Sequence, residues 1–285
     1  MTIDVVQGGL FTTIQDRGRV GFEAYGIPQN GFLDIESATL ANHLVGNNKN
    51  EALLEITGTG PILKFDEDCI IAITGANMSP SINNRFVPSK KLLYINAGDQ
   101  LSFGKLKSGY RSYLAIGGKL MIEEIYGSKS TNTIAGFGGL NGNPLTKGDI
   151  INVKKCLHST NRSVQKSNVS TRVQRMVLIT KGPEFDWFSA KEVSRFMRHL
   201  FTISNQSNRM GCQLQGNWLE GKELKTIISS GNIPGVIQIT PDLQPIILLN
   251  DAGTTGGYPR IALCTQRGIN TLAQCKPGDS IGFSF

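Results

Sequence analysis

Gly278-Asp279-Ser280-Ile281-Gly282-Phe283 is a Gly-Asp turn followed at once by apolar residues two positions apart. The same arrangement occurs in Gly98-Asp99-Gln100-Leu101-Ser102-Phe103 and in Gly148-Asp149-Ile150-Ile151-Asn152-Val153. A spacing of two is the period of a strand that buries one face. Because copies occur in both parts of the chain, the pattern indicates two related β-rich halves.

Short apolar segments bounded by Gly or Pro predict further strands at Ile70–Thr74, Leu92–Asn96, Ser112–Ile116, Met176–Thr180, Val236–Thr240 and Ile261–Thr265. Helices are expected to be few. Asp34 can cap a helix that begins at Ile35 and stops near Gly46, and Ser189-Ala-Lys-Glu192 is a capping box. Many short strands with few helices favour barrels or sandwiches over alternating βαβ units.

A basic, serine-rich segment divides the chain. Residues 154–175 contain six Lys or Arg residues and no acid, and they are poor in large apolar groups. Such composition is typical of a solvated linker. We therefore predict an N-terminal subdomain over residues 1–153, a basic polar linker over 154–175 and a C-terminal subdomain over 176–285.

Composition is that of an ordinary globular protein: 285 residues, 39% hydrophobic and 18% charged, with a formal net charge of +7. No apolar stretch approaches a membrane span, and the N-terminus lacks the pattern of a signal peptide, so we expect a cytoplasmic protein without a membrane partner. No stacking aromatics or groove-entering helix accompany the basic cluster, so we expect no nucleic acid. An anionic substrate or an acidic partner protein would explain the charge equally well.

The sequence offers no standard metal, nucleophile or nucleotide motif. Five cysteines without a C-x-x-C pair and three scattered histidines predict no metal site and neither a Ser-His-Asp nor a Cys-His nucleophile. Gly117-Gly118-Lys119 is followed by leucine, which fails the P-loop pattern, and Asn141 interrupts a dinucleotide fingerprint. ATP is therefore not expected to bind this chain through a standard phosphate loop.

Asp251-Ala-Gly-Thr-Thr-Gly-Gly-Tyr-Pro-Arg260 is the strongest candidate for a binding segment, because it follows the apolar run Ile246 to Leu249. Glycines at 253, 256 and 257 would let a ligand approach the backbone, while Thr254, Thr255 and Tyr258 offer donors without bulk. A plain glycine-rich turn between two core strands is the alternative.

Ordered motifs along nearly the whole chain resemble the biotin-dependent carboxyltransferase family, which includes the C subunit of 5-oxoprolinase and the second subunit of allophanate hydrolase. The matching segments are Gln15 to Gly21, Ile27 to Asp34, Leu54 to Thr57, Ile73 to Ala76, Gly127 to Thr131, Ser207 to Gly211, Ile237 to Pro241 and Asp251 to Pro259. Three positions differ from the residues that are usual in the family motifs: Asn30 stands in place of Ser, Asn208 in place of Asp and Gly253 in place of Gln. The resemblance implies a mainly β fold with a few helices, built as two tandem cyclophilin-like β-barrel subdomains.

The polar residues of these segments are the candidate site. We place Asp251 and Tyr258 in catalytic roles, with substrate bound by Asp16, Arg17, Asn30, Asp34, Arg209, Thr254 and Thr255. An arginine fork matches a carboxylate or phosphate, although either arginine could instead bond loop carbonyls. Asp34 could be only a helix cap, and Asp251 could act as a base only if burial raises its pKa.

The resemblance implies two chemistries for a small cyclic amide or urea. One is ATP-dependent opening of 5-oxoproline to glutamate, in which this chain would be the C subunit of a 5-oxoprolinase beside separate subunits A and B. The other is biotin-dependent carboxyl transfer to urea. No Met-Lys-Met biotinyl motif or fused biotin carboxylase region is found, which favours the first. A third hypothesis is that the chain is a regulatory, non-catalytic partner of the B subunit. In the catalytic readings, we expect the glycine-bearing segments from both ends of the chain to line one pocket.

Overall fold

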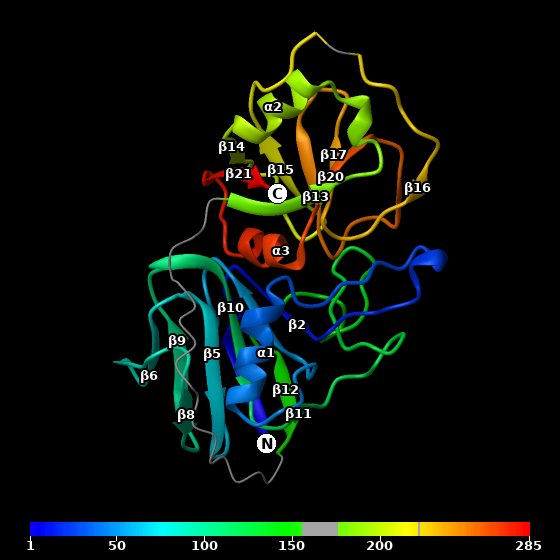
Figure 1. Ribbon diagram of the computed structural model, residues 1–285. Coiled ribbons are helices and arrows are strands. Elements are labelled where there is room, and N and C mark those ends of the chain that lie inside the picture. Colours follow the sequence, from blue (N-terminus) through cyan, green and yellow to red (C-terminus); the bar gives the residue numbers. More distant parts are fainter. Residues whose placement is uncertain (156–175, 222) are drawn as a thin grey trace. The chain divides into compact units, whose positions relative to one another are not determined.

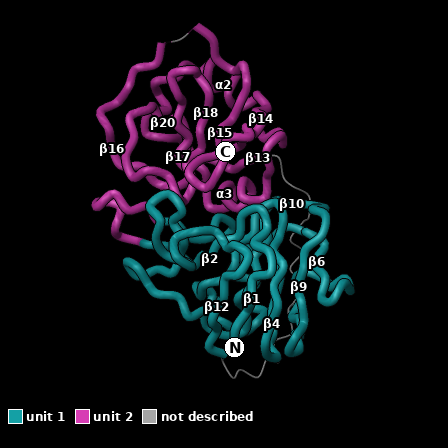
Figure 2. The backbone as a smooth tube through the Cα atoms, turned by 180° about the vertical axis from the view of Figure 1, so that it is seen from behind, with its two compact units in different colours: residues 1–19, 30–171 teal, residues 20–29, 172–285 magenta. Residues whose placement is uncertain are grey.

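The computed structural model describes residues 1–155, 176–221 and 223–285. They form two compact units, one containing residues 1–19 and 30–155 and the other containing residues 20–29 and the described residues from 176 onward (Figure 2). The predicted linker lies mostly outside the described residues. Grouping of residues 20–29 with the second unit was not predicted, because a short excursion of this kind leaves no compositional mark.

The first unit contains two antiparallel sheets. The seven-stranded sheet has the order β11 (Lys119–Leu120), β12 (Ile150–Lys154), β1 (Thr2–Gln7), β4 (Ile62–Phe65), β9 (Gln100–Phe103), β6 (Pro80–Ile82), β7 (Arg85–Phe86). The five-stranded sheet has the order β2 (Phe11–Gln15), β3 (Leu53–Thr57), β10 (Ser108–Ile116), β5 (Cys69–Asn77), β8 (Leu92–Ile95). Both are labelled in part in Figure 1.

Both faces of the five-stranded sheet are apolar, because successive side chains along its strands point to opposite faces and many of them are apolar. In β10, Leu114 joins the core shared by the two sheets, whereas Tyr113 and Ala115 join a second cluster with helix α1 (Ile35–Leu44). Successive side chains of a strand point to opposite faces, so a sheet covered on both sides needs a continuous apolar run. The run Ser112–Ile116 is therefore a central strand, not an edge.

The second unit is a closed barrel. Its strand order is β13 (Met176–Lys181), β20 (Arg260–Cys264), β17 (Val236–Ile239), β18 (Pro245–Leu248), β15 (Gly211–Gln215), β14 (Phe201–Ile203), β21 (Ser280–Ser284). Helices α2 (Ala190–Arg198) and α3 (Gln266–Ala273) accompany it, with a small ribbon of β16 (Ser230–Gly231) and β19 (Thr255–Gly256). Two 3₁₀ turns, Glu23–Tyr25 and Phe185–Trp187, complete the unit. The predicted fold class, mainly β with a few helices, is confirmed.

The three Gly-Asp turns share one geometry. Gly98, Gly148 and Gly278 have φ of 88°, 94° and 85°, in the left-handed region that favours glycine. The aspartate that follows each glycine accepts a hydrogen bond from the backbone N–H three residues earlier, at 2.8, 2.7 and 2.9 Å. Each turn then starts a strand, β9, β12 or β21, as predicted.

The two predicted helices begin directly after their predicted N-caps, Asp34 and Ser189. Asp34 accepts from the backbone N–H of Ser37 at 3.0 Å, and both halves of the capping box between Ser189 and Glu192 are present. Helix α3 was not predicted, and Thr265, expected to end a strand, is instead its N-cap. Gly268 made the sequence of this helix look unfavourable for helix formation, because glycine is a poor helix former. It is needed there because an added Cβ would lie 2.5 Å from the Leu178 carbonyl oxygen.

No helix among the described residues is long and apolar enough to cross a membrane.

We predict that Gly148→Ala and Gly278→Ala each lower the free energy of unfolding by about 1–2 kcal/mol. The cost comes from backbone conformation alone, because an added Cβ at either position would meet no atom within 4 Å. Urea denaturation measures the change. Lys147→Ala, at the exposed residue before Gly148, is the control and should lie within about 0.5 kcal/mol of the parent.

Candidate functional site

Asp16 organises the polar cluster of the first unit, directly after β2. Its carboxylate accepts four hydrogen bonds, from the backbone N–H groups of Gly18 (2.8 Å) and Lys129 (2.7 Å) and from the hydroxyls of Ser128 (2.6 Å) and Ser130 (2.7 Å). Two segments more than 100 residues apart are thus joined by one side chain. The predicted substrate ligand Asp16 has its oxygens engaged by the protein itself.

Arg19 is the residue of this cluster that sequence reasoning missed. Its side chain is fully buried, and its guanidinium donates to the carbonyls of Ile125 (3.0 Å) and Ser130 (2.6 Å) and to Oδ1 of Asn30 (2.8 Å). The guanidinium carbon also lies 4.7 Å from the ring centroid of Phe137. A buried cation surrounded by loop carbonyls is a structural arginine, the alternative weighed for Arg17 and Arg209. Its position in the Gln15 to Gly21 motif was the only available signal.

Asn30 and Asp34 are also buried in the first unit. Asn30 has a φ of 54° and supplies the acceptor for Arg19. Asp34 accepts from both the N–H and the hydroxyl of Ser37, at 3.0 and 2.6 Å, while its own N–H donates to the hydroxyl of Tyr113 at 2.7 Å. Asp34 is therefore a helix cap, and a role in substrate binding stays a prediction.

A pocket of about 560 Å³ opens beside this cluster, lined by residues of the first unit that include Asp16, Arg17, Glu51, Lys119 and Lys129. Lys129 pairs with Glu51 at 3.3 Å. Arg17, in contrast, is exposed. Of the residues predicted to bind substrate, Asp16 and Arg17 line this pocket.

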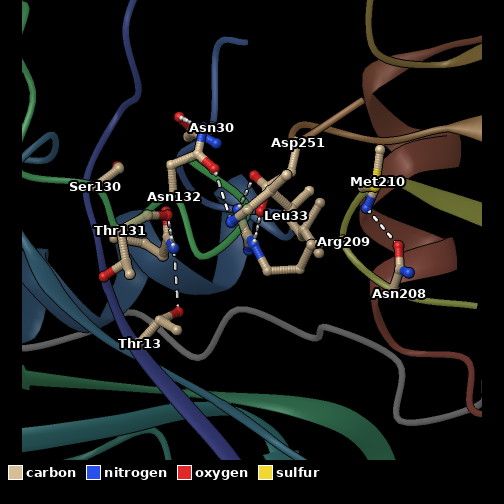
Figure 3. A network of polar contacts seen from close by, with 12 residues as sticks. Thr13, Asn30, Leu33, Ser130, Thr131, Asn132, Asn208, Arg209, Met210 and Asp251 are labelled. Carbon is tan, nitrogen blue, oxygen red and sulfur yellow. Dashed lines mark hydrogen bonds and ion pairs between the residues drawn. The ribbon is translucent and has the colours of Figure 1, made fainter. Parts of the chain in front are cut away.

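In the second unit, Arg209 and Asp251 form a buried two-point ion pair (Figure 3). Nε and Nη2 of the guanidinium lie 2.9 and 3.0 Å from the two carboxylate oxygens, and the side chains are 6% and 2% exposed. The backbone N–H of Asp251 also donates to the carbonyl of Arg209 at 3.0 Å. Because both oxygens of Asp251 accept from Arg209, action of Asp251 as a base would require this pair to open.

The segment after Asp251 forms part of a two-stranded ribbon. Thr255 in β19 pairs with Gly231 in β16, and the carbonyl of Thr254 accepts from the N–H of Asn232 at 2.8 Å. An added Cβ at Gly256 would lie 2.5 Å from Nδ2 of Asn232, so that side chain would have to shift. Thr255 and Tyr258 are exposed, whereas Thr254 is half-buried.

Arg260 and Glu184 hold the base of this ribbon and were not predicted. Arg260 donates to Glu184 from Nε and Nη2, both at 2.7 Å, and from its backbone N–H at 3.0 Å. It also reaches the carbonyl of Gly231 at 3.3 Å. These hydrogen bonds lower the pKa of Glu184 below its ordinary value of 4.5 and raise that of Arg260.

Among the described residues, no group of three or more His, Cys, Asp or Glu side chains could hold a metal ion. Burial raises the pKa of the Cys264 thiol, which disfavours the thiolate needed of a nucleophile. The structure thus gathers the predicted residues into two clusters, each inside one unit. That both line a single pocket stays a prediction.

The family model for the carboxyltransferase domain, subdomains A and B, matches residues 25–285. The chain belongs to this family. It is 37% identical to the C subunit of 5-oxoprolinase from Escherichia coli K12 over 99% of this chain and 90% of that protein. It is also 32% identical to urea amidolyase of Lachancea kluyveri, over 98% of this chain but 17% of that protein.

Comparison with a solved structure agrees with this family assignment. The urea amidolyase of K. lactis superposes with a TM-score of 0.89 at 29% identity, over 99% of this chain and 18% of that chain. The chain thus spans less than a fifth of the length of the two urea amidolyases and nine-tenths of the E. coli protein.

Each of the three residues that differ from the usual carboxyltransferase motifs is compatible with its local surroundings. Asn30 adopts a left-handed φ, which asparagine tolerates better than most residues. Oδ1 of Asn208 accepts from the N–H of Met210 at 2.7 Å, a bond that the usual aspartate could make equally well (Figure 3). Gly253 is exposed and has room for a side chain.

We predict strong coupling between Arg209 and Asp251. Arg209→Ala or Asp251→Ala alone should lower the free energy of unfolding by about 3–5 kcal/mol, because each leaves a buried charge without its partner. The double variant Arg209→Leu/Asp251→Leu should lose much less than the sum of the single changes. Urea denaturation of all three gives the coupling energy, and strict additivity would contradict the prediction.

We predict that Glu184 contributes to stability in a pH-dependent way. A carboxylate with a depressed pKa stabilises the folded state fully above its ordinary value of 4.5, and the contribution is lost as the pH falls through the lower, folded pKa. Glu184→Gln should therefore cost about 2 kcal/mol at neutral pH and should flatten the fall in stability below pH 4.5. Unfolding free energies across the acidic range measure this, and parallel curves would contradict it.

Proposed function

We propose that this chain is the C subunit of an ATP-dependent 5-oxoprolinase, which opens 5-oxoproline to L-glutamate together with subunits A and B. One observation carries the proposal: the similarity to the E. coli protein extends over 99% of this chain and 90% of that protein. The match is therefore to nearly the whole of a separate polypeptide. With the urea amidolyases, the match is to one part of a far longer chain.

The proposed reaction balances as three steps that consume two water molecules. The lactam oxygen of 5-oxoproline attacks the terminal phosphorus of ATP, releasing ADP and leaving a phosphorylated ring with a polarised carbon. Water then adds to that carbon, and the ring C–N bond breaks as the nitrogen takes a proton, which leaves an acyl phosphate of glutamate. A second water molecule attacks this acyl phosphate, and phosphate leaves. The products are glutamate, ADP and phosphate, and the chemistry needs groups that bind a small flat amide and stabilise charge on oxygen.

Tyr258 would meet the second requirement. Its side chain is 38% exposed, in the segment whose ribbon is fixed by Arg260 and Glu184. A phenol held by a rigid segment can donate a hydrogen bond to a developing oxyanion. Thr254 and Thr255 would orient the ring beside it, and Asp251 would act through Arg209 as long as their ion pair stays closed.

ATP would be used by the complex and not through a standard phosphate loop of this chain. The partners would be the separate subunits A and B, and the chain alone would be inactive. Two alternatives keep the same family: a carboxyltransferase component that takes a carboxyl group from biotin to urea, and a regulatory partner of the B subunit that performs no chemistry.

The test is reconstitution from the purified proteins. Glutamate release from 5-oxoproline and ATP should require this chain together with subunits A and B. Tyr258→Phe should lower the turnover by about 100-fold without weakening assembly, because it removes a single donor. Tyr94→Phe is the matched control, since Tyr94 is 72% exposed on β8 of the first unit, and it should keep the parent rate.

Each alternative gives a different result. Glutamate release that persists undiminished without this chain would exclude it from the reaction. Urea consumption that depends on bicarbonate and is abolished by avidin would identify the carboxyltransferase. Firm association with the B subunit, with turnover unaffected by Tyr258→Phe, would leave only the regulatory role.

A further inference from the structure

Helix α2 of the second unit borders a hollow of about 540 Å³ that none of the family-like motifs explains (α2 is labelled in Figure 1). Its lining includes Lys191, Arg195, Arg198, His199, Trp218 and Glu220. We call this hollow the α2 groove. Its volume lies in the range of small-molecule sites, about 300–1,000 Å³.

The three cations of the α2 groove share one face of the helix. Lys191, Arg195 and Arg198 are related by steps of four and three residues, which places neighbours about 5–6 Å apart at Cβ. With a rise of 1.5 Å per residue, the row is roughly 10 Å long. All three residues are exposed.

Charge in the α2 groove is not balanced by the protein. Among the residues that the structure describes, Lys191, Arg195 and Arg198 form no ion pair. Glu192, the acid next in sequence, has one carboxylate oxygen bonded to the N–H of Ser189 at 2.6 Å in the capping box. Glu220 is the carboxylate of the lining, against three cations. Like charges at these spacings destabilise a helix by a few tenths of a kcal/mol per pair.

The helix dipole does not account for the whole row. Arg195 and Arg198 lie in the last turn, where a positive charge is favourable. Lys191 lies in the first turn, where a positive charge is unfavourable. A ligand that neutralises the row would explain all three positions.

Aromatic packing makes the floor of the α2 groove rigid. Trp218 is only 2% exposed, and its indole N–H donates to the carbonyl of Leu243 at 2.7 Å. Its ring meets Phe196 of α2 edge to face, at 5.2 Å between centroids. His199 packs on Phe201 at 4.7 Å. The backbone that carries the cations is therefore fixed before any ligand arrives, which reduces the entropic cost of binding.

We propose that the α2 groove binds a ligand carrying two or more phosphoryl groups. Guanidinium forks bind phosphate oxygens in two-point geometry, and a row about 10 Å long matches linked phosphates better than a single carboxylate. The shared chemistry is a polyphosphate chain, either inorganic or belonging to a nucleotide. This site goes beyond the proposed function and does not depend on it.

Tryptophan fluorescence provides a direct test, because the chain has two tryptophans and one lines the groove. In a Trp187→Phe background, inorganic tripolyphosphate should give a saturable change in the emission of Trp218. Calorimetry on the parent should give the same affinity, and raising the salt concentration should weaken it. Arg195→Gln/Arg198→Gln should weaken binding by at least about tenfold, since glutamine preserves helix propensity but removes both forks.

The matched control is Lys64→Gln/Arg85→Gln, which removes two exposed charges from strands of the first unit. It should bind like the parent. If the groove double variant unfolds, Lys191→Gln provides a milder change at the row's other end and should still weaken binding. Circular dichroism confirms that each variant is folded.

Two ligands then identify the source of the phosphates. ATP binding more tightly than tripolyphosphate, with the same dependence on Arg195 and Arg198, would identify a nucleotide, and equal affinities would identify the phosphates alone. Absence of tripolyphosphate binding, or binding equally weakened by the control pair, would overturn the proposal. Preference for polyglutamate over tripolyphosphate would also overturn it, in favour of an acidic protein segment.

Discussion

A charge removed from water must find a partner inside the protein, and this constraint arranges the polar residues of both units. In the first unit, the fully buried Arg19 bonds three loop carbonyls and Asn30, while Asp16 gathers four donors around one carboxylate. In the second unit, Arg209 and Asp251 satisfy each other. Loops that would otherwise be free to move are thereby fixed.

This pairing separates the residues that build the site from those that can meet a ligand. Side chains engaged by the protein hold backbone segments in place, and the exposed Arg17, Thr255 and Tyr258 remain accessible. Sequence motifs do not reveal this division, because both kinds of residue occur side by side. Arg17 and Arg19 are two positions apart, yet one is exposed and the other is buried.

Local signals were reliable wherever a few neighbouring residues determine the conformation. Asp34 and Ser189 cap helices because cap and N–H belong to adjacent residues, and the Gly-Asp turns start strands for the same reason. Signals failed where the cause was distant. Gly268 looks like a helix breaker, but close packing of α3 against the Leu178 carbonyl requires it. Glu184 carried no motif, and only its contact with Arg260 reveals its role.

By itself, the sequence determined the class of fold, the positions of its turns and caps, and membership of the carboxyltransferase family through ordered motifs. Tertiary structure alone decided which polar groups of those motifs are engaged and which are exposed. It also aligned the cations of α2 along a groove in which positive charges outnumber negative ones. The physical reason is range: turns and caps depend on residues a few positions apart, whereas burial and charge pairing depend on segments that only folding brings together.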